Sequence, residues 1–317
     1  MNPMRTQPLM QKSIFDVADW ESDPEFGVFP QGARAKEAVF APSRPPEPVL
    51  VPGKRYLFKR SKRSYPDQFW GEIIAYRIGC LLGVKVPPAF AAWNSKTGHC
   101  AALIEWFYNE NTESFIMAGD FLQRMHKEFD RKLGIQHNFE DNMVLLRMFS
   151  IQRILIEPNW QQWWIDALLF DALTGNTDRH QDNWGFIFTR SEQTVSCRLA
   201  PLFDNGTSLG HERFTDRVNL WPKTSVDRYI GNGKHHLKWS MDDPVQGHFE
   251  LLKRTVEEWP DTRDAVRAKL NFPLDELSEV TGDLLWLDAA IPLTQERHAF
   301  ILRLLKERLA LLKAMFL

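Results

Sequence analysis

The sequence predicts an α+β protein with two lobes, a small strand-rich lobe at residues 1–107 and a larger helical lobe at residues 108–317. The main observation is a change of periodicity. Apolar residues alternate as in strands before residue 107 and recur mainly at helical spacing after it. The second observation is size, because 317 residues are enough to bury a sizeable core in a two-lobed chain.

The composition is that of an ordinary globular protein, with 44% hydrophobic and 25% charged residues. A formal net charge of −2 gives no support for a nucleic-acid or anionic-membrane surface, so we expect neither as a direct partner. Cys80, Cys100 and Cys197 are scattered and form no CxxC pair, which favours a reducing compartment. The first residues lack the apolar run of a signal peptide, and we expect a cytoplasmic location.

Four strands and one helix are expected in the first lobe. Residues 55–59 alternate apolar and polar side chains as a strand does, and Pro66 suits the first turn of a helix that runs to Leu81 and stops at Gly83. The other expected strands are residues 39–40, 90–93 and 101–106. Residues 42–52 are rich in proline and should form an exposed connection, and residues 1–26 show no clear periodicity.

In the second lobe, helical spacing of apolar residues predicts helices at residues 143–156, 160–173 and 294–317. The last of these is expected to dock on the core, with a dimer contact as the alternative. A β-hairpin is expected from residues 186–188 and 199–203, because short apolar runs flank a polar stretch there.

Two polar motifs beside this hairpin carry the strongest functional signal. Residues 176–186 read NTDRHQDNWGF, and residues 201–206 read PLFDNG. Asp178, Asn183 and a strand-borne Asp204 follow one another in the order that ATP-dependent phosphoryl transfer requires. Asp178 would orient a hydroxyl and accept its proton, and Asn183 and Asp204 would hold Mg²⁺ on the phosphates. Each residue alone is a common turn residue, but the ordered set predicts a catalytic site.

A lysine and a glutamate in the first lobe complete this set. Lys59 lies on an expected strand and Glu72 on the helix that follows it. An ion pair between them would aim the lysine ammonium at the α- and β-phosphates of ATP. Other basic residues surround Lys59, but its place in the alternating strand favours it.

Further nucleotide contacts are expected at two backbone positions. Gly32 and Ala33 belong to a turn of small residues whose N–H groups can approach phosphate closely, although one glycine makes neither a GxGxxG motif nor a Walker A motif. Glu105 and Phe107 end a strand where the chain passes between lobes, and backbone groups there could pair with the adenine edge.

Polar residues near the proposed base are expected to order it. Arg179 and His180 follow Asp178 directly and could position the loop or pair with Asp171 or Asp182. His180 is counted with the cofactor-binding residues and not with the metal ligands, because no second histidine stands at ligand spacing. Residues 233–239, GKHHLKW, could bind substrate, order the site or form a surface loop.

A strand-rich lobe before a helical lobe is the layout of the protein-kinase-like superfamily, and the motifs resemble those of the HipA-like serine/threonine kinases. The matching segments lie in the same order along the chain: residues 31–36, 56–59, 72–77, 82–87, 175–186, 201–210 and 233–239. The resemblance implies a bilobal kinase fold with Asp178 as the base, Asn183 and Asp204 as Mg²⁺ ligands and Lys59 as the phosphate-binding lysine.

The same resemblance implies an activity and its partners. It implies ATP·Mg²⁺-dependent transfer to a Ser or Thr hydroxyl of a protein, often in a bacterial toxin–antitoxin setting, with an antitoxin or a small companion subunit as partner. An effector that is secreted and acts in another organism's cytosol is also compatible with it.

The sequence departs from the HipA pattern at two points. Only about 30 residues precede the glycine turn, so the chain resembles a short form without the additional N-terminal subdomain. Members of the family often carry a regulatory phosphorylated serine near that turn, whereas residues 27–41 contain no Ser or Thr.

Two other functions stay open at this point. The Asp-Arg-His pattern followed by Asn also resembles the catalytic loop of phosphoinositide kinases, which makes a lipid or small-molecule kinase an alternative. A nucleotide-sensing pseudokinase module is the other, although pseudokinases usually lack one of the key polar residues, and this chain retains all of them.

Overall fold

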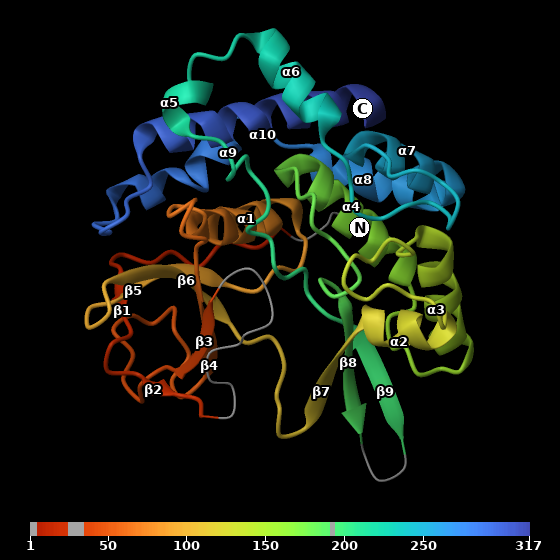
Figure 1. Cartoon of the computed structure of the whole chain (residues 1–317), viewed down its shortest axis with the longest axis horizontal. Helices are drawn as coiled ribbons and strands as arrows, with labels where there is room; N and C mark the ends of the chain where they lie inside the picture. The colour runs from red at the N-terminus through yellow and green to blue at the C-terminus, as the bar shows by residue number, and fades with distance from the viewer. Residues whose placement is uncertain (1–4, 25–34, 191–193) are drawn as a thin grey trace.

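The computed structural model describes residues 5–24, 35–190 and 194–317, which form two β-sheets covered on one side by helices (Figure 1). Both sheets lie below a layer that contains helices α1 and α4, and helix α10 lies above that layer. Among the described residues, no helix has the length and apolar character needed to cross a membrane. The proposed lobe boundary at residue 107 falls between the last strand of the first sheet and the first strand of the second.

The first sheet has six strands in the order β1-β5-β6-β4-β3-β2. All neighbours are antiparallel except β1 and β5, which are parallel. The strands are β1 (Phe15–Asp16), β2 (Glu21–Ser22), β3 (Lys36–Phe40), β4 (Arg55–Arg60), β5 (Ala89–Asn94) and β6 (His99–Glu105). The four expected strands are confirmed. β1 and β2 were not expected, because two residues are too few to show a period.

Helix α1 (Phe69–Leu82) packs between the first sheet and helix α4 (Trp160–Thr174). All of its residues are buried, as expected for a helix in which only Glu72 and Arg77 carry charge. Gly83 ends α1 with φ of 63°, a left-handed conformation that glycine adopts without a steric penalty. Pro66 lies in the turn just before α1, so the expected helix is confirmed with a start three residues later.

Polar contacts fasten α1 to the C-terminal part of the chain. Trp70 Nε1 donates to the carbonyl oxygen of Ile291 (3.1 Å), and Arg77 forms an ion pair with Asp283 (3.1 Å). Lys269 Nζ donates to the carbonyl oxygen of Gly83 (3.0 Å) just beyond its last turn. The helix that carries Glu72 is therefore held at both ends and in the middle.

The second sheet is antiparallel, with β7 (Glu113–Met117), β8 (Gly185–Arg190) and β9 (Val195–Leu199) in that order. The expected strand at residues 199–203 is wrong: β9 ends at Leu199, and the chain then leaves the sheet, with Leu202 N donating to Lys85 O (2.8 Å). Asp204 is therefore not borne on a strand. β7 was not expected in a region that reads as helical.

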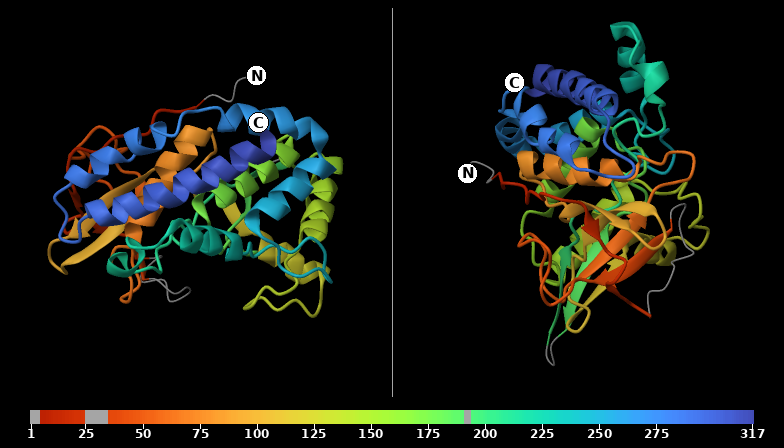
Figure 2. Two further views of the ribbon diagram at one scale, coloured as in Figure 1. Left: turned by 90° about the horizontal axis from the view of Figure 1, so that it is seen from above. Right: turned by 90° about the vertical axis from the view of Figure 1, so that its left-hand side faces the viewer.

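The remaining helices form the body of the second lobe. They are α2 (Ala118–Met125), α3 (Phe139–Ile151), α5 (Thr215–Val218), α6 (Lys223–Asn232), α7 (His248–Glu258), α8 (Arg263–Leu270), α9 (Glu276–Glu279) and α10 (Gln295–Phe316). Expected helix 143–156 is α3, which ends earlier because Arg153 adopts a positive φ of 58° and Cys197 N pairs with Ile154 O. Figure 2 shows α10 running over α4, and their contact confirms that the terminal helix docks on the core.

Buried His248 links α7 to the motif at residues 176–186. Its Nε2 donates to the carbonyl oxygen of Asn176 (2.7 Å), and its Nδ1 has no hydrogen-bond partner in the described part of the chain. Burial, with the nearby charge of Arg308, lowers the pKa of His248 to about 3. The ring is therefore neutral in the folded protein at every pH above that value.

We predict that the protein loses stability as the pH falls below about 6.5, because the unfolded chain then binds a proton at His248 that the folded chain does not. His248 alone should lower the free energy of unfolding by about 2 kcal/mol between pH 7.5 and pH 5. Urea unfolding at both pH values measures the difference. His248→Gln removes the titrating group and should reduce this pH dependence. An equal pH dependence in both proteins would contradict the prediction.

Candidate active site

Lys59 and Glu72 form a buried ion pair, as the sequence predicts. Lys59 Nζ lies 2.7 Å from Glu72 Oε1, and their side chains are 2% and 3% exposed. The other carboxylate oxygen of Glu72 accepts a hydrogen bond from Asn205 N (2.9 Å). Glu72 thus joins strand β4, helix α1 and the segment around Asp204.

Asp204 completes the group. Its Oδ1 lies 2.6 Å from Lys59 Nζ and its Oδ2 lies 3.7 Å from Lys36 Nζ. The Asp204 backbone has φ of 56°, a conformation that is uncommon outside glycine and that persists where surrounding contacts enforce it. Those contacts include Gln68 Nε2 to the carbonyl oxygen of Gly206 (3.0 Å) and the bond from Asn205 N to Glu72.

Asp178 lies in a loop that begins where α4 ends. Gly175 stops α4 with φ of 71°, and Asp178 N then donates to Asn176 Oδ1 (3.0 Å), forming a tight side-chain turn. The side chain of Asn183 closes the loop, because its Nδ2 donates to the carbonyl oxygen of Asp178 (2.6 Å). The predicted base and the predicted amide ligand are therefore parts of one compact unit.

Thr207 contacts the proposed base, a role that no sequence motif indicates. Its hydroxyl donates to Asp178 Oδ2 at 3.3 Å, and its carbonyl oxygen accepts from Thr177 N (3.4 Å). The Asp178 side chain is otherwise 43% exposed, so a substrate hydroxyl can reach it. Thr207 follows Asp204 by three positions, and its contact brings the two motifs together.

Arg179 is fully buried and connects the motifs through its guanidinium. It forms a bidentate ion pair with Asp171 on α4, in which Nε donates to Oδ2 (3.0 Å) and NH2 donates to Oδ1 (2.8 Å). Its NH1 donates to the carbonyl oxygens of Asn183 (3.2 Å) and Phe203 (2.7 Å), and its NH2 also donates to Asn205 Oδ1 (2.7 Å). Of the two predicted partners, Asp171 is therefore the one used.

His235 gives the GKHHLKW segment its role. The ring Nδ1 accepts from Leu237 N (3.0 Å), so Nε2 carries the proton and donates to Asp171 Oδ2 (3.2 Å). Burial alone would raise the pKa of Asp171, but the charge of Arg179 and the hydrogen bond from His235 outweigh it and lower the pKa to about 2. Asp171 therefore remains ionised. Through His235, residues 233–239 help to order the site and do not merely form a surface loop.

His180 lies beside the proposed base. Its Nδ1 accepts from Asp182 N (3.1 Å), and its Nε2 lies 4.0 Å from Asp178 Oδ1. The ring of His236 packs edge-on against it at 5.8 Å, and burial with the charge of His180 lowers the pKa of His236. The rings of His180 and His236 thus lie together beside the loop of Asp178.

The residues predicted to contact the nucleotide through their backbone lie in different surroundings. Glu105 ends β6, and its carboxylate pairs with Lys54 (2.5 Å), so a nucleotide contact there would have to come from the backbone. Phe107 stacks on Phe203, with ring centroids 5.3 Å apart, next to the segment of Asp204. Gly32 and Ala33 lie outside the described residues.

The oxygen donors fit a hard divalent cation. The hydrogen bond from Asn183 Nδ2 to the loop leaves Oδ1 as the atom with which Asn183 could bind a metal, and Asp204 already faces two ammonium groups. No group of three His, Cys, Asp or Glu side chains in the described ranges could hold a metal unaided. Mg²⁺ commonly binds one or two protein oxygens together with substrate phosphates, and this donor set suits that kind of site.

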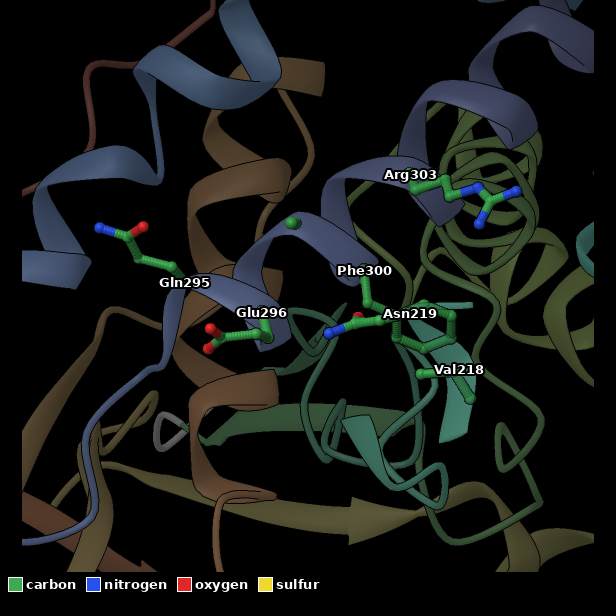
Figure 3. Close-up of a pocket in the computed structure, with 7 residues that line it drawn as sticks. Val218, Asn219, Gln295, Glu296, Phe300 and Arg303 are labelled. Atoms are coloured by element: carbon green, nitrogen blue, oxygen red, sulfur yellow. The ribbon is translucent and has the colours of Figure 1, made fainter. Parts of the chain in front are cut away.

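A hollow of about 390 Å³ lies elsewhere, between α5 and the start of α10 (Figure 3). Val218 and Phe300 form its apolar floor, and Glu296 and Arg303 stand at either side. None of the described residues that line it belongs to the predicted catalytic set.

Comparison with known proteins places the chain in a family. The model of the HipA-like C-terminal domain matches residues 29–269. A curated relative, the serine/threonine-protein kinase CtkA of Helicobacter pylori, is 27% identical over 157 residues, which are 46% of this chain and 42% of that protein. The sequence match thus spans less than half of the length of this relative.

Solved structures show the fold. The crystal structure of a Helicobacter pylori proinflammatory kinase CtkA gives a TM-score of 0.72 at 19% identity and covers 95% of this chain and 97% of that chain. The chain therefore has the fold of that kinase, in agreement with the predicted bilobal α+β class. The HipA–HipB complex of Shewanella oneidensis MR-1 with its operator DNA gives a TM-score of 0.49 at 15% identity and covers 93% of this chain and 66% of that chain.

The buried pair of Asp171 and Arg179 yields a stability prediction. Asp171→Asn leaves the guanidinium without its counter-charge in a buried site, which should lower the free energy of unfolding by about 3–5 kcal/mol. Arg131→Met is the matched control, because Arg131 pairs with Asp182 of the same loop but is 26% exposed, and it should cost about 1 kcal/mol or less. Urea unfolding measures both. Equal costs would refute the central role of the buried pair.

Proposed function

The chain belongs to the family of HipA-like C-terminal domains, and we propose that it is an ATP- and Mg²⁺-dependent protein serine/threonine kinase. The observation that carries this proposal is the position of Lys59, whose ammonium is buried between Glu72 and Asp204. Arg179 fixes the segment of Asp204 against the loop of Asp178, which supports a single site for the proposed phosphate-binding and proton-accepting residues. The curated relative is a serine/threonine-protein kinase, which supports the choice of a Ser or Thr acceptor.

In this mechanism Asp178 orients the acceptor hydroxyl and takes its proton as the hydroxyl oxygen attacks the γ-phosphorus. The bond to the bridging oxygen of ADP breaks, and ADP leaves with the electron pair. Thr207 holds Asp178 Oδ2 so that the carboxylate keeps one orientation, and Lys59 binds the phosphates. Asn183 and Asp204 would hold Mg²⁺, which neutralises the charge of the phosphates when bound.

The biological setting is a separate part of the proposal. The family resemblance favours a bacterial toxin–antitoxin module, with a cytoplasmic kinase and an antitoxin or companion subunit as its partner. It likewise favours a protein as the phosphate acceptor. A lipid, a small molecule or no acceptor at all would be recognised in the experiment below.

We predict that the chain phosphorylates serine or threonine in a bacterial lysate supplied with Mg²⁺·ATP, as mapped by mass spectrometry. Asp178→Asn should lower the rate by about 10²–10⁴ and spare ATP binding, because it removes only the proton acceptor. Asp204→Asn should also weaken Mg²⁺-dependent ATP binding. Asp182→Asn, in the same loop but outside the proposed set, is the control and should stay active.

The outcomes separate the candidate functions. Phosphoserine or phosphothreonine made by the unmutated chain and not by Asp204→Asn establishes a protein kinase. ATP binding without protein phosphorylation would shift the function to a non-protein acceptor or to nucleotide sensing. Equal ATP affinity in the Asp178→Asn and Asp204→Asn variants would overturn the roles given to the two aspartates.

Thr207 provides a finer prediction. Thr207→Val keeps the shape of the side chain but removes the hydroxyl that orients Asp178, so kcat should fall by about tenfold while the KM for ATP is unchanged. Thr207→Ser retains a hydroxyl and should restore most of the rate. Steady-state kinetics of the three proteins tests this. A Ser variant as slow as the Val variant would mean that Thr207 acts through packing.

A further inference from the structure

Lys36 is a basic residue in the site to which the mechanism above gives no task. It lies directly opposite Lys59 on the neighbouring antiparallel strand β3. Side chains of directly opposed residues project from the same face of a sheet, and two like charges in that arrangement are destabilising. The sheet therefore concentrates positive charge at one point, and this charge needs an anion.

Asp204 and Glu72 balance the two lysines in the structure. Lys59 Nζ contacts Glu72 at 2.7 Å and Asp204 Oδ1 at 2.6 Å, whereas Lys36 Nζ lies 3.7 Å from Asp204 Oδ2. Asp204 is also the carboxylate that is proposed to hold Mg²⁺. When that carboxylate serves a metal, the ammonium of Lys36 needs another anion, and the phosphates of the nucleotide are the anions that the proposed function brings there.

The two lysine side chains differ in how far they are exposed to solvent, and this difference suggests different roles. The side chain of Lys59 is 2% exposed and that of Lys36 is 23% exposed. Lys59 is fixed at the bottom of the site by Glu72, and Lys36 stands at its solvent side. The outer lysine is placed to meet the outer part of a polyphosphate chain.

We propose that Lys36 is a second phosphate-binding lysine that makes the site selective for nucleoside triphosphates over nucleotides with fewer phosphates. This inference rests on the proposed function, because it assumes that a nucleotide binds between Lys59 and Asp204. It adds a specificity-determining side chain to the proposed site.

Calorimetric titration of the full chain with AMP, ADP and ATP in Mg²⁺ tests the proposal. Lys36→Met should weaken ATP binding about tenfold or more, the effect of losing one charge-assisted hydrogen bond, and leave AMP binding within about twofold. Lys36→Arg keeps the charge and should retain the preference for ATP. Lys96→Met removes a lysine of the same lobe that pairs with Asp19 in an exposed turn, and should bind all three nucleotides as the unmutated chain does.

The titrations distinguish failure of this inference from failure of the proposed function. If the unmutated chain binds ATP and Lys36→Met binds it equally well, or loses affinity equally for AMP and ATP, the role of Lys36 is overturned and the kinase proposal stands. If the unmutated chain binds none of the nucleotides, both proposals fall. A thermal unfolding midpoint of Lys36→Met at or above that of the unmutated chain shows that weaker binding does not arise from unfolding, because the variant removes one of two opposed like charges.

Discussion

The guanidinium of Arg179 is the group on which the geometry of the site depends. It joins helix α4, the loop of Asp178 and the segment of Asp204 through hydrogen bonds to Asp171, Asn183 and Phe203. Phosphoryl transfer needs its reacting groups positioned to a fraction of an ångström, and loops alone do not provide that precision. A buried pair contributes little net stability when it is compared with apolar residues, so its value here lies in fixing two loops against a rigid helix.

The balance between the buried ammonium of Lys59 and two carboxylates explains why the folded chain tolerates this cluster of charges. Lys59 would be costly to bury alone, but Glu72 and Asp204 surround it with carboxylate oxygens. The same arrangement holds Asp204 in its left-handed backbone conformation. The ammonium and the carboxylates therefore hold one another in place through their mutual contacts.

The sequence allows the local parts of this arrangement to be predicted, and tertiary contacts decide the rest. Lys59 and Glu72 could be paired because a strand and a helix follow one another within 13 residues. The contacts of Thr207 with Asp178 and of His235 with Asp171 span 29 and 64 residues, and no local pattern reports such distances. Strand β9 was placed too late because the expected hairpin used the apolar residues 199–203, although Val195, Cys197 and Leu199 alternate with polar residues as a strand does, and β1 and β2 are too short for a period to appear.

Helix α1 is buried on every face and is tied to the C-terminal part of the chain through Trp70 and Arg77. Any rotation of α1 would bring apolar side chains into water on one side and break these bonds on the other. A ligand that acted by displacing α1 would have to supply that free energy from its own binding. Displacement of α1 is therefore costly, and the same packing that buries the helix also fixes the position of Glu72 opposite Lys59.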